Sequence, residues 1–241
     1  SGFRSARLFV TTSIVDTFTS RIAKKRPMPM FVVDDAEWSL KRKAQRFRRF
    51  IHSKLREADY ERLCAGIVND ACVRGTGVGY IDEGDEDVIS ERVHRSEIYV
   101  EPREARQGAK GVRQIHWIRQ VSREVMAAKF PEFADQIMSA PASSVPSRDA
   151  STGDDWLLSG GIVESDDVID VTYSWHLRSG VNSTDGRRAI CLDNFTMMFE
   201  QWDGDRFPFL FLHRYKPKRG FWGRGDVELL ADLQARVNAI V

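Results

Sequence analysis

The sequence predicts an α+β protein with amphipathic helices first, then a mostly antiparallel β region with a short inserted helix, and finally the start of another helix. Apolar residues recur at steps of three and four in the first third of the chain. They alternate with polar residues further on and return to helical spacing after residue 225. With 241 residues, 42% of them apolar and 29% charged, the chain is long enough to bury a core.

Residues 1–75 are predicted to form a helical part. A first helix over about residues 5–25 ends before Pro27 and Pro29, which force an extended link. Asp34 and Glu37 resemble a capping box at the start of a second helix, and a third helix reaches about Arg74. Each helix carries one apolar stripe, formed in turn by Leu8, Val15, Phe18 and Ile22, by Leu40, Ala44, Phe47, Ile51 and Leu55, and by Tyr60, Leu63, Ile67 and Ala71.

Residues 76–139 are predicted to combine strands with a short helix. We expect strands over residues 78–82, 88–93, 98–100 and 112–119. Ser122 is expected to cap the helix, which runs to Phe130, and a further turn or two reaches Met138. The glycines of residues 75–79 follow a helix and precede a strand, the reverse of the order in a nucleotide-binding loop. We therefore interpret them as a helix C-cap and a turn.

The second half of the chain is predicted to contain a loop, a sheet and the start of a helix. Residues 140–165 lose periodicity and are rich in Ser, Pro and Gly, which predicts a flexible loop. Residues 166–220 read as antiparallel strands over residues 169–177, 188–192 and 195–201, with a buried apolar strand over residues 207–212. In residues 221–241 a helix begins whose stripe is Leu229, Leu233, Val237 and Ile240. No C-cap signal precedes Val241, so we expect the protein to continue beyond it.

Positive charge is concentrated in one arm of the chain. Between Arg21 and Arg56 twelve Lys and Arg residues stand against three acids, although the net charge of the whole chain is only +1. Such a concentration predicts a partner-facing surface, and a polyanion such as DNA is the first candidate.

Five acids crowd between Asp82 and Asp87, around Gly84. Paired carboxylates can hold Mg²⁺ for phosphodiester chemistry. Acids on one tight turn do not converge as those of separate strands do, so we favour a solvated hairpin tip. No metal or other cofactor is predicted, because the five His residues are scattered and none lies at ligand spacing from Cys64, Cys72 or Cys191.

Four segments together resemble the portal, or head-to-tail connector, proteins of tailed bacteriophages. In chain order they are Val15–Thr17 leading to Arg26–Pro29, Gly75–Gly77 entering a strand, Glu97–Pro102 followed by Val121–Glu124, and Phe207–Phe209 leading to Gly220–Gly225 and a helix with Gln234 and Asn238. Their order and spacing extend over nearly the whole chain. The resemblance covers the N-terminal wing region of that family and the start of its stem helix.

This resemblance implies a structural subunit and not an enzyme. Portal subunits form a dodecameric ring at one capsid vertex of the virion and are assembled in the host cytoplasm. The ring is the channel for packaging and ejection of double-stranded DNA, and it binds the terminase, the major capsid protein and the head–tail adaptor or tail proteins. Terminase performs the ATP hydrolysis. No cofactor or membrane is implied, and the parts that line the DNA channel are expected after Val241.

The resemblance also gives two sets of candidate residues. Wing helices of portals face outward and toward neighbouring subunits, so the basic arm is expected to contact DNA, scaffold, capsid protein or a neighbouring subunit. Its candidate residues are Lys24, Lys25, Arg26, Lys41, Arg42, Lys43, Arg46, Arg48 and Arg49. Gly220, Gly223 and Gly225 are expected to form the hinge into the stem helix. A solvated helix face, balanced by acids of the next subunit such as Asp82–Asp87, explains the charge equally well.

Two functions of other classes stay open. A metal-dependent nucleic-acid-processing enzyme would use the acids between Asp82 and Asp87, and a DNA-binding module would use the basic arm.

Overall fold

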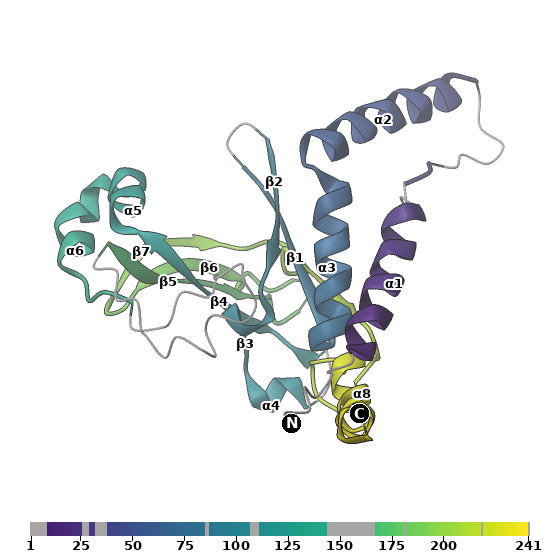
Figure 1. The fold of residues 1–241 in the computed structure, drawn as a ribbon. Helices are drawn as coiled ribbons and strands as arrows, with labels where there is room; N and C mark the ends of the chain where they lie inside the picture. The colour runs from purple at the N-terminus through teal and green to yellow at the C-terminus, as the bar shows by residue number, and fades with distance from the viewer. Residues whose placement is uncertain are drawn as a thin grey trace. The chain divides into compact units, whose positions relative to one another are not determined.

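The computed structural model describes residues 9–25, 29–31, 38–84, 87–106, 111–143, 167–180, 182–217 and 219–240. Contacts divide the chain into two compact units, Ser1–Arg95 with Pro208–Val241, and Ser96–Phe207. We call them the helical unit and the sheet unit. Both combine helices with antiparallel strands, which confirms the predicted α+β class (Figure 1).

The helical unit contains four helices, α1 (Val10–Lys25), α2 (Trp38–Glu57), α3 (Tyr60–Arg74) and α8 (Asp226–Ile240). Helices α1 and α3 lie side by side, and α2 runs away from the N-terminal end of α3 (Figure 1). Val15 of α1 is buried with Val68 and Cys72 of α3, and Phe18 and Ile22 pack against them. Val15, Phe18 and Ile22 of the predicted stripe therefore face a core, whereas Leu8 lies outside the described residues. The predicted capping box at Asp34 and Glu37 lies outside the described residues.

A three-stranded antiparallel sheet completes this unit in the order β2–β1–β8. Its strands are β1 (Thr76–Glu83), β2 (Val88–Val93) and β8 (Phe209–His213). The backbone of α3 lies directly on β1, because a Cβ on Gly77 would come within 1.9 Å of the Ile67 carbonyl oxygen. A charged contact fixes the same packing: buried Asp70 of α3 accepts hydrogen bonds from Arg92 of β2, at 2.6 Å from its Nε, and from Arg74 at 2.9 Å.

The prediction of a buried strand over residues 207–212 is wrong in part. β8 is an edge strand, and its side chains alternate between half-buried and exposed. Phe211 packs edge-on against Phe221, with ring centroids 4.8 Å apart. Leu210 and Leu212 point to the opposite face, where Leu210 stays 57% exposed. The continuous run of apolar residues predicted burial of both faces of the strand, but only one face of β8 is covered by described residues.

The sheet unit contains a five-stranded antiparallel sheet in the order β3–β4–β5–β6–β7. Its strands are β3 (Ile98–Val100), β4 (Gln114–Ser122), β5 (Val168–His176), β6 (Arg187–Leu192) and β7 (Phe195–Gln201). The strands over residues 98–100 and 195–201 fall where the sequence predicted them. β4 begins two residues later than expected and reaches Ser122. Asp193, in the turn between β6 and β7, has a positive φ, as is common in tight hairpin turns.

Two short helices pack against this sheet, α5 (Arg123–Lys129) and α6 (Ala134–Ser139), with a 3-10 turn at Pro131–Phe133 between them. A third, α4 (Pro102–Ala105), follows β3. Met126 of α5 and Ile137 of α6 are buried in one cluster with apolar residues of β5, β6 and β7. Buried Arg123 donates hydrogen bonds from Nη1 to the carbonyl oxygens of Ile137 and Ala140, at 3.0 and 2.6 Å. It thereby satisfies orphan carbonyls at the end of α6.

Two local predictions in this unit need correction. Ser122 occupies the N-cap position of α5, but its side chain makes no capping hydrogen bond, because it is still the last residue of β4. The predicted flexible loop does not begin at residue 140 either. Ser143 is buried, and its hydroxyl donates to Asp170 at 2.7 Å and accepts from Gln120 at 2.8 Å. Residues 144–166 lie outside the described residues.

The close approach of α3 to β1 makes a testable prediction. Gly77→Ala should lower the free energy of unfolding by about 1–3 kcal/mol or more, because the added methyl group meets rigid backbone. Denaturant titration measures the change. Gly180→Ala is the matched control, since nothing lies within 4 Å of its Cβ position. An equal loss in both variants would contradict the packing described for Gly77.

Candidate functional site

Helix α2 is the most exposed element of the helical unit, and none of its residues is buried. Leu40, Phe47 and Phe50 lie on one face, and Phe47 is 50% exposed. Phe31 packs edge-on against Phe47, with ring centroids 4.8 Å apart. Lys43 shares this face, because helical residues four apart lie one above the other. α2 therefore offers an apolar surface that the described residues cover only in part.

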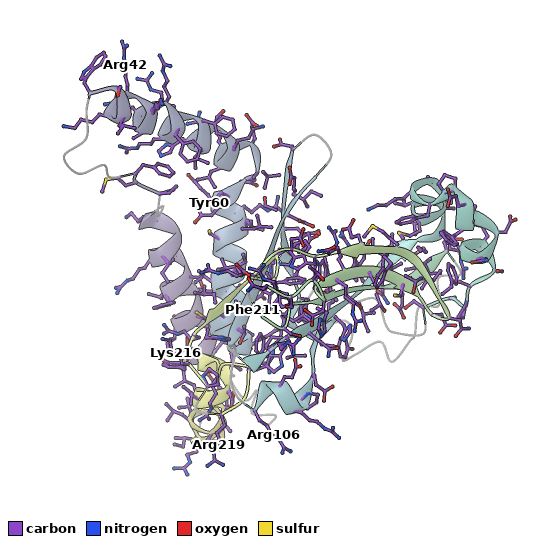
Figure 2. The ribbon with its side chains drawn as sticks, turned by 180° about the vertical axis from the view of Figure 1, so that it is seen from behind. Arg42, Tyr60, Arg106, Phe211, Lys216 and Arg219 are labelled. Atoms are coloured by element: carbon purple, nitrogen blue, oxygen red, sulfur yellow. The ribbon has the colours of Figure 1, made fainter. Side chains whose placement is uncertain are left out.

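The opposite face of α2 is polar and basic. At 100° per residue, Arg42 and Arg49 lie almost opposite Phe47, and Arg46 and Arg48 flank them. The Arg42 guanidinium lies over the Trp38 ring, 4.2 Å from its centroid, at the end of the helix away from α3 (Figure 2). Six of the predicted basic residues are thus exposed on α2: Lys41, Arg42, Lys43, Arg46, Arg48 and Arg49.

The remaining residues of the predicted basic set lie elsewhere. Lys24 is exposed in the last turn of α1. The side chain of Lys25 and the whole of Arg26 lie outside the described residues. The structure therefore brings together the part of the set that belongs to α2.

A shallow polar groove runs along the basic face. It is lined by Gln45, Arg48, Arg49, His52, Ser53 and Arg56. Four of these residues were missed as candidates: Gln45, His52, Ser53 and Arg56. The signal was present in the sequence, since Gln45, His52 and Arg56 stand at helical spacing from Arg49. The Nε2 atom of His52 is enclosed and has no hydrogen-bond partner among the residues that the structure describes.

Among the residues that the structure describes, Lys54 of α2 forms ion pairs with two acids. Its Nζ lies 2.9 Å from Glu57 of the same helix and 3.1 Å from Asp87 at the tip of the β1–β2 hairpin. The pKa of Lys54 is raised, most strongly by its hydrogen bond to Glu57 and next by the one to Asp87. The pKa of Asp87 is lowered, most strongly by the hydrogen bond from the Val88 amide and next by the one from Lys54. The hairpin tip thus balances one lysine of its own chain, a pairing that sequence spacing did not reveal.

The acids of the hairpin do not form a described metal site. Asp82 accepts a hydrogen bond from the Tyr80 hydroxyl at 2.6 Å, and Asp87 is held by Lys54. Asp85 and Glu86 lie outside the described residues. Within the described ranges, no three His, Cys, Asp or Glu side chains gather as metal ligands. The three cysteines are free thiols.

The predicted hinge glycines occupy two different environments. Gly220 has a φ of +85° and open space around its Cβ position, so it forms a turn that favours glycine. Gly223 and Gly225 are packed against the end of α3: their Cβ positions lie 2.5 Å from the Gly75 oxygen and 2.6 Å from the Val73 oxygen. Close backbone packing explains these two glycines. Their role as a hinge stays a prediction.

Helix α8 is anchored at its N-terminal end. Buried Asp226 accepts hydrogen bonds from Arg214 Nε at 2.9 Å and from the Tyr215 hydroxyl at 3.0 Å. The Arg214 guanidinium also lies 3.7 Å from the ring centroid of Phe18 on α1. Further along α8, Gln234 accepts a hydrogen bond from the Thr11 amide at 3.1 Å. The start of α8 is therefore fixed to α1, α3 and β8.

The rest of α8 leaves an apolar stripe uncovered. Leu229 is exposed, and Leu233 and Ile240 are 56% and 86% exposed, whereas Val237 is half-buried. These residues form the stripe predicted from the sequence. Exposed apolar side chains that line up on one helix face are typical of interaction surfaces.

Neither the protein families nor the curated proteins supply a relative of the chain. No family model matches the chain, and no curated protein matches it. None of the described helices has the length and apolar character needed to cross a membrane.

The burial of α2 predicts its local stability. In the free chain, amides of residues 38–50 should exchange hydrogen faster than those of Ile67–Cys72 on α3, because few side-chain contacts oppose local opening of α2. Hydrogen exchange with mass spectrometry measures both segments in one sample. Equal protection of the two helices in a monomeric sample would contradict this description of α2.

The anchor of α8 makes a second prediction. Asp226→Asn should cost about 3 kcal/mol of unfolding free energy, because it leaves Arg214 without the carboxylate that it contacts in a largely buried position. Glu228→Gln is the control in the same helix turn, and it should cost less than about 1 kcal/mol, because Glu228 and Arg224 are both exposed. A similar cost for both would show that the Asp226 contact does not anchor the helix.

Proposed function

We propose that the chain is the wing region and the start of the stem helix of a phage portal subunit, a structural protein that assembles into a ring. The observation that carries the proposal is the combination found in α8. Its N-terminal end is fixed by Asp226, while Leu229, Leu233 and Ile240 form an uncovered apolar stripe. A lateral contact in a ring needs such a helix, because a defined orientation and a free apolar face must coexist.

The positions of the resembling segments add support. Gly75–Gly77 and Gly220–Gly225 are far apart in sequence, yet the Cβ position of Gly75 lies 2.2 Å from the Gly223 oxygen. Thr76 connects them further, since its hydroxyl accepts a hydrogen bond from the Gly223 amide at 2.9 Å. Two of the four segments that carry the resemblance to portal proteins therefore belong to one structural junction.

In this proposal the chain has no catalytic residues and no cofactor. The ring, expected to be dodecameric, lies at one capsid vertex of the virion. It forms the channel through which double-stranded DNA is packaged and ejected, and it binds the major capsid protein, the terminase and the head–tail adaptor or tail proteins. These partners follow from the resemblance to portal proteins.

Self-assembly tests the proposal. Native mass spectrometry and particle images of the protein should show a closed ring with a central channel. Replacing Leu229 and Leu233 by Glu should shift the population toward monomer, because charges in an apolar contact are left without partners.

The control is Val125→Glu/Met138→Glu, which puts the same charge at exposed apolar positions of α5 and α6 in the sheet unit. This variant should assemble like the unchanged protein. A protein that stays monomeric at high concentration, or rings that tolerate the α8 changes, would overturn the proposal. Mg²⁺-dependent cleavage of DNA by a monomer would favour the nuclease alternative instead.

A further inference from the structure

The basic face of α2 is a surface that assembly of the proposed ring does not use. We propose that this face, formed by Arg42, Gln45, Arg49, His52 and Arg56, binds the phosphate backbone of double-stranded nucleic acid independently of base sequence. The proposal does not depend on ring assembly, because a monomer would present the same face.

The first step is the excess of charge. Between Trp38 and Glu57 the helix has eight Lys and Arg residues and one acid, Glu57. The structure gives Lys54 ion pairs with Glu57 and Asp87. It shows no ion pair of the other seven with any described residue. Seven cations close together on one helix repel one another, and a polyanion relieves that repulsion by replacing many small counterions.

The second step is the position of the cations around the helix axis. Arg49 and Arg56 lie opposite Phe47, at the centre of the polar face. An amphipathic helix on an anionic membrane buries its apolar face and leaves the centre of its polar face in water. Membrane binding through Phe47 and Phe50 would therefore leave the Arg49 side of α2 unused. The partner of that side has to approach from the polar direction.

The third step is spacing along the helix. Arg42, Arg49 and Arg56 are separated by seven residues, which corresponds to about 10.5 Å at ~1.5 Å per residue. Gln45 and His52 lie between these arginines on the same face. The polar face of α2 therefore presents a continuous row of basic and hydrogen-bonding side chains along the helix.

The fourth step is the kind of cation. Five of the eight basic residues of α2 are arginines. The planar guanidinium donates two parallel hydrogen bonds to a phosphate, whereas a lysine acts as a point charge. None of the described residues that line the groove next to Arg48 and Arg49 is an acid. Charge, direction and donor geometry agree on a phosphodiester backbone.

Fluorescence anisotropy with two DNA duplexes of unrelated sequence tests the proposal over a range of salt concentrations. Both duplexes should bind with similar affinity, and the affinity should fall steeply with salt. The double variant Arg49→Gln/Arg56→Gln should bind roughly tenfold more weakly or worse at about 0.1 M salt, and the slope of log K against log salt should lose about two units. Both arginines are exposed, and Gln keeps the helix propensity, so the fold is preserved.

The matched control is Arg103→Gln/Arg187→Gln, which removes the same charge from exposed positions of the sheet unit. It should leave both the affinity and the salt slope unchanged. An equal loss of DNA affinity in the control would overturn the proposal, since it would show that the loss follows from the net charge of the protein and not from the α2 face. Absence of binding at low salt would overturn it too.

Two further results would give the face to another partner. Vesicles containing phosphatidylserine that bind the protein through Arg49 and Arg56, without competition from DNA, would assign it to a membrane. A change in oligomeric mass in the Arg49/Arg56 variant, with DNA binding intact, would assign it to a second copy of the chain. Ring formation is read separately by native mass, so failure of DNA binding leaves the proposed assembly standing.

Discussion

The helical unit depends on a backbone contact between two glycine segments. Gly75 ends α3 with a φ of +87°, and its Cβ position lies 2.2 Å from the Gly223 oxygen. No side chain fits between these two backbone segments. Thr76 supplies the side-chain hydrogen bonds at this contact. Its fully buried hydroxyl lies 3.0 Å from His213 Nδ1 and accepts a hydrogen bond from the Gly223 amide at 2.9 Å. The ends of α3, β8 and the segment before α8 are joined at this point.

The junction explains why one end of the unit is fixed while other surfaces stay open. α8 begins where Asp226 meets Arg214 and Tyr215, directly after the glycines, so its direction is set within one helical turn. Among the described residues, the far part of α8 and most of α2 stay exposed. Burial is concentrated at the junction, and the exposed apolar and basic faces lie on the helices that lead away from it. These exposed faces are therefore a consequence of how the described part of the unit is built.

The sequence was sufficient for elements whose pattern has a single period. The α1 stripe at Val15 and the alternation around Val171 both marked core positions correctly. It was insufficient where a long-range contact decided the outcome. Ser143 is ordered because two strands far along the chain present Gln120 and Asp170 to it, and no local composition shows that. The candidate site divides in the same way: helical spacing placed six cations on α2, but the Lys54–Asp87 pair required the fold of the hairpin.

The Lys54–Asp87 pair also shows how far acids of the protein itself balance the charge of the basic arm. If the hairpin acids were the natural counterpart of α2, they would have to reach the face of Arg42, Arg49 and Arg56. Asp87 instead meets Lys54, which lies on the Phe47 side near the end of the helix, and Asp82 is held by Tyr80. Asp82 and Asp87 are therefore held away from the face of α2 that carries Arg42, Arg49 and Arg56. In a neighbouring copy, Asp82 and Asp87 of the hairpin would be held by Tyr80 and Lys54 in the same way. The polar face of α2 is thus better matched by a partner that carries regularly spaced anions of its own.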